Sequence, residues 1–318
     1  MTMNLLIARP MTAEVEARAR AEFDVEIRAN TAVLSQDEMV QALQDFDVVM
    51  PTLGDAFDAD VFSRVPAPRC KLLANFGVGY NHIDVAAAAA HGVQVSNTPG
   101  AVTDATADIA LTLILMSARR AAEGERLVRS GNWPGWHPTQ MLGQHVTGKK
   151  LGIIGMGRIG EAIARRCHFG FGMEVAYIAR SEKNPGFAAT RMPDLMQMAA
   201  EVDFLVVAVP GGPETRHLVD QAVLAAMKPT AHLINIARGE VVQQEALIAA
   251  LQDQRIGGAG LDVYEFEPEV PQALCDLNNV TLLPHLGTAT DEVRSAMGHM
   301  ALDNVAAFAS GKALLNPV

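Results

Sequence analysis

Short apolar runs alternate with helical patterns in two separate series along this chain, and this alternation limits the fold more than any other feature. The first series has apolar runs at residues 4–8, 24–28, 46–50, 70–74 and 93–95, with helical patterns at 11–22, 36–43 and 58–64. The second series has apolar runs at residues 151–155, 174–179, 203–209, 232–236, 258–261 and 280–283. Strands that alternate with helices form parallel sheets with helices on both faces. The sequence therefore predicts an α/β protein with two doubly wound domains.

The two series differ in what connects and follows them. A long helical pattern covers residues 101–130, and another begins at about 290 and ends at about 310. The last segment is too short to fold alone, so we expect it to pack on the first series. Six strands are the number found in a dinucleotide-binding Rossmann domain. We therefore expect a Rossmann domain at residues 100–287, inserted into a flavodoxin-like domain made of residues 1–99 and 288–318.

Composition excludes several kinds of partner. A net charge of −11 among 318 residues disfavours nucleic acid and anionic membrane surfaces. The longest uncharged apolar stretch, residues 109–118, is too short to cross a membrane. The three cysteines are widely spaced and suggest no metal site, and the N-terminus lacks a signal-peptide pattern. We expect a cytoplasmic protein without a bound metal.

A glycine-rich turn follows the first strand of the second series. In GIIGMGRIG, Gly155, Gly157 and Gly160 have the G-x-G-x-x-G spacing, and a helical pattern begins immediately afterwards. Such a turn lets the backbone approach a pyrophosphate, and the first amides of the helix, at Arg158 and Ile159, add donors and a positive dipole end. The turn predicts a dinucleotide site.

The residue that closes the next strand indicates which dinucleotide binds. NAD sites usually place an acidic residue there, which accepts hydrogen bonds from the ribose hydroxyls. This chain has Ala179, followed by Arg180 and Ser181. A guanidinium and a hydroxyl suit the 2′-phosphate of NADP. The alternative is that Arg180 stacks on adenine while either NADP or NAD binds, and the nearby Glu182 keeps that alternative open.

Four chemically useful side chains fall at or just beyond the ends of three later strands. Arg238 follows one strand, Asp262 ends the next with Glu267 five residues later, and His285 follows the last. Reduction of a 2-oxo acid requires a proton donor, for which histidine is well suited, and a neighbouring carboxylate orients it. A planar arginine can bind the substrate carboxylate, and Asp262 is placed to accept from the nicotinamide carboxamide.

Several segments together resemble the D-2-hydroxyacid dehydrogenase family, most closely its glyoxylate/hydroxypyruvate reductases. The resemblance covers nearly the whole chain, in the order NFGVGYNHID, NTPGAVTDATAD, GIIGMGRIG, PGGPETRHL, INIARGE, GLDVYEFEPEV and LLPHLGTAT. It implies that His285 is the general acid, Glu267 its partner, and Arg238 the residue that orients the substrate.

The resemblance also implies contacts for further residues. Val78 and Gly79 would offer backbone amides to the substrate carboxylate from the first domain, and Leu53 and residues 76–81 would influence substrate size. Cofactor contacts would come from Thr106, Val209, Pro210, Thr215, Ile236 and Ala237. Closure between the domains would exclude water. A homodimer is implied, and Trp136 would reach the partner's active site unless it and Trp133 serve only in packing.

The sequence thus predicts an NADPH-preferring reductase of small 2-oxo acids, with glyoxylate and hydroxypyruvate as the first candidates and NAD as the alternative cofactor. A reductase of 2-ketogluconate or another sugar acid would use the same residues. A nucleotide-sensing, corepressor-like scaffold belongs to a different class, and retention of the three catalytic residues does not separate it from an enzyme.

Overall fold

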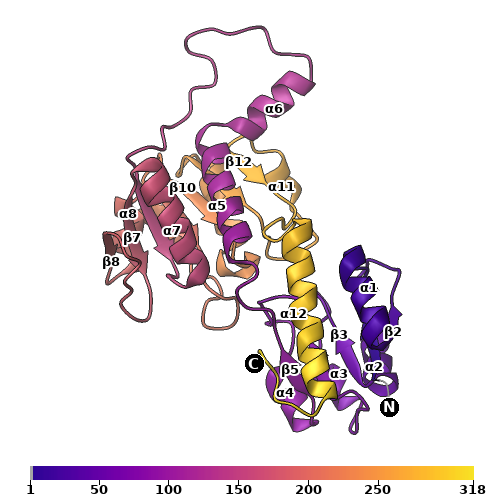
Figure 1. Ribbon diagram of the computed structural model, residues 1–318. Coiled ribbons are helices and arrows are strands. Elements are labelled where there is room, and N and C mark those ends of the chain that lie inside the picture. The colour runs from indigo at the N-terminus through magenta and orange to yellow at the C-terminus, as the bar shows by residue number, and fades with distance from the viewer. Residues whose placement is uncertain (1–2) are drawn as a thin grey trace. The chain divides into compact units, whose positions relative to one another are not determined.

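The computed structural model describes residues 3–318, which form two compact units (Figure 1). Unit 1 comprises residues up to Val102 together with Ala289–Val318, and unit 2 comprises Thr103–Thr288. Unit 2 is therefore inserted into unit 1. Within residues 3–318, no helix combines the length and the apolar character that crossing a membrane requires.

Unit 1 is built on a parallel sheet of five short strands. The strands are β1 (Asn4–Ile7), β2 (Asp24–Ile27), β3 (Val48–Met50), β4 (Leu72–Ala74) and β5 (Gln94–Ser96). Their spatial order is β2-β1-β3-β4-β5, which is the flavodoxin-like order. The central strands are apolar and buried at every position, because helices cover both faces of a parallel sheet.

Five helices cover the sheet of unit 1. They are α1 (Ala13–Glu22), α2 (Gln36–Asp45), α3 (Ala59–Ser63), α4 (Val85–Ala90) and the C-terminal α12 (Asp291–Ala309). Helices α2, α3 and α4 pack on one face, and α1 and α12 lie side by side on the other (Figure 1). A Cβ atom on Gly298 of α12 would lie 2.5 Å from Val15 of α1, so this glycine permits the close approach. The C-terminal helix α12 thus packs against α1 and β4.

Unit 2 contains a parallel sheet of seven strands. These are β6 (Lys150–Ile154), β7 (Glu174–Ile178), β8 (Ala189–Arg191), β9 (Phe204–Val207), β10 (His232–Asn235), β11 (Gly258–Leu261) and β12 (Val280–Leu282). The spatial order is β12-β11-β10-β9-β6-β7-β8. This is the Rossmann order with one added edge strand, and the direction of winding reverses between β6 and β9. Ligands of such sheets bind outside the carboxyl ends of the strands at this reversal.

Most helices of unit 2 form a layer on each face of its sheet. The elements are α5 (Thr103–Ala118), α6 (Ala121–Arg129), α7 (Arg158–Phe171), α8 (Leu195–Glu201), α9 (Gln221–Ala226), the 3-10 turn η1 (Gly239–Val241), α10 (Gln244–Gln252) and α11 (Gln272–Cys275). Helices α5 and α7 lie side by side on one face (Figure 1). Helices α8, α9, α10 and α11 contribute to the core on the other face.

The predicted α/β fold class is confirmed, and three local predictions were wrong. The sheet of unit 2 has seven strands rather than six, because the polar three-residue β8 carries no apolar signal. The single helix expected over residues 101–130 is two helices, separated at Arg120, where φ is +52°. Helix α4 was missed in an alanine-rich stretch that begins after the N-cap Asp84, whose side chain accepts from the amide of Ala87.

Candidate active site

Three adjacent strands of unit 2 bring the predicted catalytic loops to one edge of the sheet. β10 pairs with β11 and β11 pairs with β12, all in parallel. Arg238 lies three residues after β10, Asp262 one residue after β11, and His285 three residues after β12. Because all three strands point the same way, these loops lie at the carboxyl edge, where doubly wound sheets bind ligands.

A histidine and a carboxylate are in direct contact at this edge. His285 Nδ1 lies 2.8 Å from Glu267 Oε2, and Glu267 Oε1 accepts from the amide of Tyr264 at 3.0 Å. The two side chains are 31% and 30% exposed, so they are accessible to a ligand yet partly screened from water. Burial raises the pKa of Glu267, but the contacts with His285, the Tyr264 amide and the charge of Arg238 outweigh it, and the net pKa is lowered. Glu267 is therefore an ionised partner that orients the imidazole.

Asp262 stabilises the loop that carries His285. Its carboxylate accepts from the amides of Leu286 at 2.6 Å and Gly287 at 2.8 Å, and its own carbonyl accepts from the amide of His285 at 3.0 Å. Burial raises the pKa of Asp262, against the lowering effect of these amides and of His285. We predicted that Asp262 and Thr106 contact the cofactor. Asp262 is 1% exposed and Thr106 donates to the carbonyl of Gly287 at 3.3 Å, so both support the His285 loop, and their contact with the cofactor stays a prediction.

Arg238 is partly buried beside the acidic residues of the neighbouring loops. Nη1 of Arg238 donates to the carbonyl of Ala237 at 2.7 Å, and a Cβ atom on Gly211 would lie 2.7 Å from Arg238 Cγ. Burial lowers the pKa of this guanidinium, while the charges of Glu267 and Glu240 act in the opposite direction. A guanidinium always remains protonated at ordinary pH, so Arg238 supplies a fixed positive charge near Glu267.

Gly239 brings the Arg238 loop against the Glu267 loop. A Cβ atom at this position would lie 1.8 Å from the carbonyl carbon of Tyr264 and 2.2 Å from the amide nitrogen of Glu265. No side chain fits between two backbones at that distance. Gly239 is thus a requirement of the site that the sequence analysis missed, because nothing in the sequence shows which backbones approach each other.

Two further carboxylates connect the loop after β9 to the catalytic loops. Glu240 Oε1 accepts from the amide of Gly212 at 2.9 Å, and Glu265 Oε1 lies 2.7 Å from His217 Nε2. Glu265 is nearly buried and also accepts from the amide of Gln244. The sequence analysis missed these residues. The alternating acids of YEFEPE were an available signal, because Glu265 and Glu267 follow β11 within six residues of its end.

The residues predicted to contact the cofactor in the loop after β9 lie in the segment that Glu240 and Glu265 contact. Val209 and Pro210 follow β9, and Thr215 donates its hydroxyl hydrogen to the carbonyl of Pro210 at 2.7 Å. Ile236 and Ala237 directly follow β10 and are nearly buried. These residues lie at the carboxyl ends of β9 and β10, beside the reversal of the sheet.

The glycine turn has the geometry that a pyrophosphate requires. Gly155 has φ +99°, and a Cβ atom there would lie 2.6 Å from the carbonyl oxygen of Ala208. A Cβ atom on Gly160 would lie 2.0 Å from the carbonyl oxygen of Gly155, so the helix approaches the turn closely. Nothing lies within 4 Å of a Cβ on Gly157, and α7 begins at Arg158, immediately followed by Ile159. Open space in front of helical amides fits the phosphates of a dinucleotide.

The loop after β7 is exposed. Arg180 and Ser181 both face solvent, beyond the end of β7 at Ile178. They lie on the opposite side of β6 from β9, as expected for residues that meet the adenosine end of a dinucleotide.

In unit 1, the loop after β4 exposes two backbone amides. The side-chain amide of Asn75 donates to the carbonyls of Gly77 at 3.0 Å and Gly79 at 3.1 Å. The side-chain amide of Asn97 donates to the carbonyl of Val78 at 2.8 Å. With the carbonyls engaged, the N–H groups of Val78 and Gly79 donate to no group in residues 3–318. Leu53, also predicted to influence the substrate, has its carbonyl bound by Arg9 at 3.0 Å.

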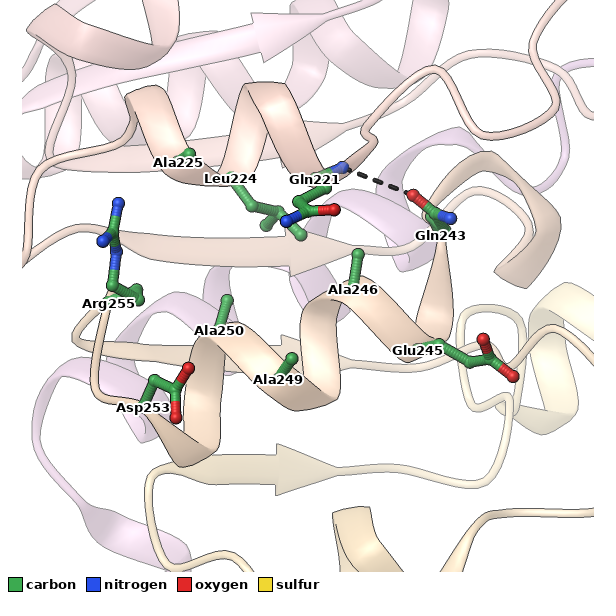
Figure 2. Close-up of a pocket in the computed structure, with 10 residues that line it drawn as sticks. All are labelled: Gln221, Leu224, Ala225, Gln243, Glu245, Ala246, Ala249, Ala250, Asp253 and Arg255. Carbon is green, nitrogen blue, oxygen red and sulfur yellow. Dashed lines mark hydrogen bonds between the residues drawn. The ribbon is translucent and has the colours of Figure 1, made fainter.

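A groove elsewhere in unit 2 does not coincide with these loops. It lies between α9 and α10, where the amide of Gln221 donates to the side-chain oxygen of Gln243 (Figure 2). Alanine side chains form much of its lining, and none of the residues predicted to bind substrate or cofactor takes part. The candidate site therefore remains the carboxyl edge of the sheet.

The fold and the site define a class of protein. The protein has a Rossmann sheet with an intact glycine turn, and a histidine–carboxylate pair beside a partly buried arginine at the same sheet edge. This is the arrangement of a nicotinamide-dependent dehydrogenase.

Comparison with known proteins identifies the family. Residues 111–287 match the model described as "D-isomer specific 2-hydroxyacid dehydrogenase, NAD binding domain". Glyoxylate reductase of Thermococcus onnurineus is 42% identical over 98% of this chain and 94% of its own. Glycerate dehydrogenase of Hyphomicrobium methylovorum is 36% identical over 96% of each chain. The structure of an NADPH-dependent glyoxylate/hydroxypyruvate reductase from Sinorhizobium meliloti, in complex with NADP and malonate, is 37% identical with a TM-score of 0.87, covering 100% of this chain and 97% of that one. The chain belongs to the D-isomer specific 2-hydroxyacid dehydrogenase family and is an enzyme with an NAD-binding domain.

Proposed function

We propose that the protein is an NADPH-preferring reductase that converts small 2-oxo acids, first glyoxylate and hydroxypyruvate, to 2-hydroxy acids. The observation that carries this proposal is the contact of 2.8 Å between His285 and Glu267 beside the charge of Arg238. The names of the relatives, glyoxylate reductase and glyoxylate/hydroxypyruvate reductase, support the substrate class.

In this proposal His285 is the general acid. Its Nδ1 faces Glu267, so its Nε2 is the nitrogen that faces a substrate. The protonated ring donates from Nε2 to the carbonyl oxygen as that oxygen gains negative charge. The neutral ring that remains keeps its proton on Nδ1 and donates it in a hydrogen bond to Glu267, which fixes the tautomer of the ring. Such proton donation contributes roughly 10²–10⁴-fold to a rate.

Arg238 and the loop after β4 are proposed to bind the substrate carboxylate. The guanidinium matches a carboxylate in charge and in planar geometry. The two N–H groups of Val78 and Gly79 are unengaged donors of the kind that bind a carboxylate oxygen. Unit 1 is thus proposed as the substrate-binding domain, and Leu53 as a residue that limits substrate size. A reductase of 2-ketogluconate or another sugar acid is the alternative within this chemistry.

The residues of unit 2 fit a dinucleotide. The glycine turn and the start of α7 would bind the pyrophosphate, the segments after β9 and β10 would line the nicotinamide half, and Arg180 with Ser181 would meet the 2′-phosphate. NADPH supplies the hydride when bound. NAD is the alternative cofactor, since an exposed arginine also stacks on adenine.

We also propose that the enzyme is a cytoplasmic homodimer. Four large apolar side chains in α6 and the segment after it are exposed, namely Val128, Trp133, Trp136 and Leu142. Exposed apolar groups gathered in one segment indicate a covered surface. Cys70 and Cys167 are buried and unpaired, in keeping with a reducing compartment. Sedimentation of the purified protein tests the dimer, and a monomeric mass would contradict it.

Oxidation of NADPH and NADH, followed in parallel with glyoxylate, hydroxypyruvate, pyruvate and 2-ketogluconate, tests the proposed activity. We expect rapid turnover with NADPH and the two small acids. Preference for NADH would overturn the proposed contact of Arg180 with the 2′-phosphate, while the protein would still be a dehydrogenase of 2-hydroxy acids. Turnover confined to 2-ketogluconate would favour the sugar-acid alternative. Dinucleotide binding without any turnover would contradict the reductase and favour a nucleotide-sensing scaffold.

A further inference from the structure

The loop that follows β7 is held by an arginine of the next strand. β8 pairs in parallel with β7, and the register places Arg191 beside Tyr177. Nε and Nη2 of Arg191 donate to the carbonyl of Ala179 at 3.2 and 2.9 Å, and Nη2 also donates to the carbonyl of Arg180 at 3.2 Å. One guanidinium thus fixes two consecutive peptide groups.

This contact sets the direction of the next two amides. The peptide bonds of the loop are trans, and in a trans peptide the C=O and the following N–H point in opposite directions. Because the carbonyls of Ala179 and Arg180 face Arg191, the N–H groups of Arg180 and Ser181 face away from it. Neither N–H donates to another group in the described part of the chain. The N–H groups of Arg180 and Ser181 are therefore available to an outside acceptor, and both residues are exposed.

The other end of the loop, at Lys183, is held by the side chain of Tyr177 in β7. The hydroxyl of the buried Tyr177 accepts from the amide of Lys183 at 2.9 Å and donates to its carbonyl at 3.3 Å. The loop is consequently fixed at both ends while its outward side is exposed. Preorganised amide donors bind an anion more tightly than mobile ones, because their ordering cost has already been met.

We propose that Arg191 is a positioning residue for recognition of the adenosine 2′-phosphate. It acts through the backbone of Ala179 and Arg180, by keeping the amides of Arg180 and Ser181 directed at the phosphate. The inference rests on the proposed use of NADPH, and it adds a residue outside the loop to the determinants of cofactor choice.

Binding of 2′,5′-ADP and 5′-AMP to the full-length chain, measured by calorimetry, tests this role without catalysis. Arg191→Ala should weaken 2′,5′-ADP about tenfold, as the loss of a charge-assisted contact implies, and leave 5′-AMP unchanged. Arg191→Lys keeps the charge but lacks the fork, so it should also lose affinity for 2′,5′-ADP. Arg165→Ala is the matched control, because Arg165 donates to the carbonyl of Pro185 in the same β7–β8 connection, and it should behave as wild type.

Each outcome has a distinct meaning. Equal binding of both ligands by the wild-type protein would overturn the proposed NADPH preference and the role of Arg191 with it. Wild-type preference for 2′,5′-ADP that survives in Arg191→Ala would overturn the role of Arg191 alone. Equal weakening of both ligands would mark Arg191 as merely structural. Full affinity in Arg191→Lys would show that only its charge matters, which also contradicts positioning through the backbone.

Discussion

The loops after β10, β11 and β12 and the loop after β7 lie at the ends of strands in one sheet, yet they hold their functional side chains differently. In the first group, buried groups such as Asp262 and close backbone packing at Gly239 fix the positions of Arg238 and His285. In the loop after β7, Arg180 is exposed and only its backbone is fixed. We therefore expect the proposed catalytic end to be sensitive to small changes and the proposed cofactor-selective end to tolerate substitution.

The largest effect is expected from His285→Ala. Removing the proton donor should lower kcat for glyoxylate reduction about 10²- to 10⁴-fold, while the affinity for NADPH, measured by fluorescence titration, stays the same. A variant with activity within a few-fold of wild type would contradict the assignment of His285 as the acid.

Gly239→Ala tests whether backbone packing sets the catalytic geometry. The new methyl group would overlap the Tyr264 backbone, so we expect a loss of about 1–3 kcal/mol in the free energy of unfolding. Displacing Arg238 from Glu267 by about 1 Å should also lower kcat/KM roughly 10²-fold. Gly170→Ala is the control, because Gly170 lies in α7 with open space around its Cβ position. Equal behaviour of the two variants would contradict the role of Gly239.

Glu267→Gln should alter the pH dependence of reduction. The lowered pKa of Glu267 keeps its carboxylate ionised as pH falls, until pH passes through that lowered pKa, so the contact with His285 persists in mild acid. Glutamine does not titrate, so the fall in rate that protonation of Glu267 causes at acid pH should disappear in the variant. A hydrogen bond to a charged group contributes about 1.5–3 kcal/mol, so we expect a rate loss of roughly 10- to 100-fold at neutral pH. An unchanged pH–rate profile would argue against the pair.

Arg180→Asp should produce the smallest change in rate and a specific change in cofactor choice. An exposed charge contact contributes about 1 kcal/mol, so we expect the ratio of kcat/KM for NADPH to that for NADH to fall about fivefold. The melting temperature should not change, because the Arg180 side chain is exposed. If the ratio stays constant, Arg180 does not meet the 2′-phosphate.

Some features of the two ends of the sheet could be predicted from the sequence, and others could not. Parallel strands end at one edge, so Arg238, Asp262 and His285 could be assigned to one site from their places after apolar runs. Glycine spacing was enough to predict the turn at Gly155. By contrast, the role of Gly239 depends on a contact between two loops that are distant in sequence.

The regions that escaped prediction have physical reasons in common. β8 has three residues, two of them polar, and its pairing with β7 supplies the hydrogen bonds that its composition does not reveal. Arg191 was missed with that strand. The break between α5 and α6 occurs at Arg120. It could not be predicted because glycine and proline, which usually indicate a helix end, are absent there.

The most direct test of the account is a double-mutant cycle between Glu267→Gln and Arg180→Asp. The hydride-transfer rate and the NADPH/NADH ratio would be measured for the wild type, both single variants and the double variant. If the two ends are held independently, the effects should add within about 0.3–0.5 kcal/mol, with Glu267→Gln changing the rate and Arg180→Asp changing only the ratio. A coupling energy above about 1 kcal/mol, or a change of cofactor ratio in Glu267→Gln alone, would contradict the separation of chemistry from cofactor choice.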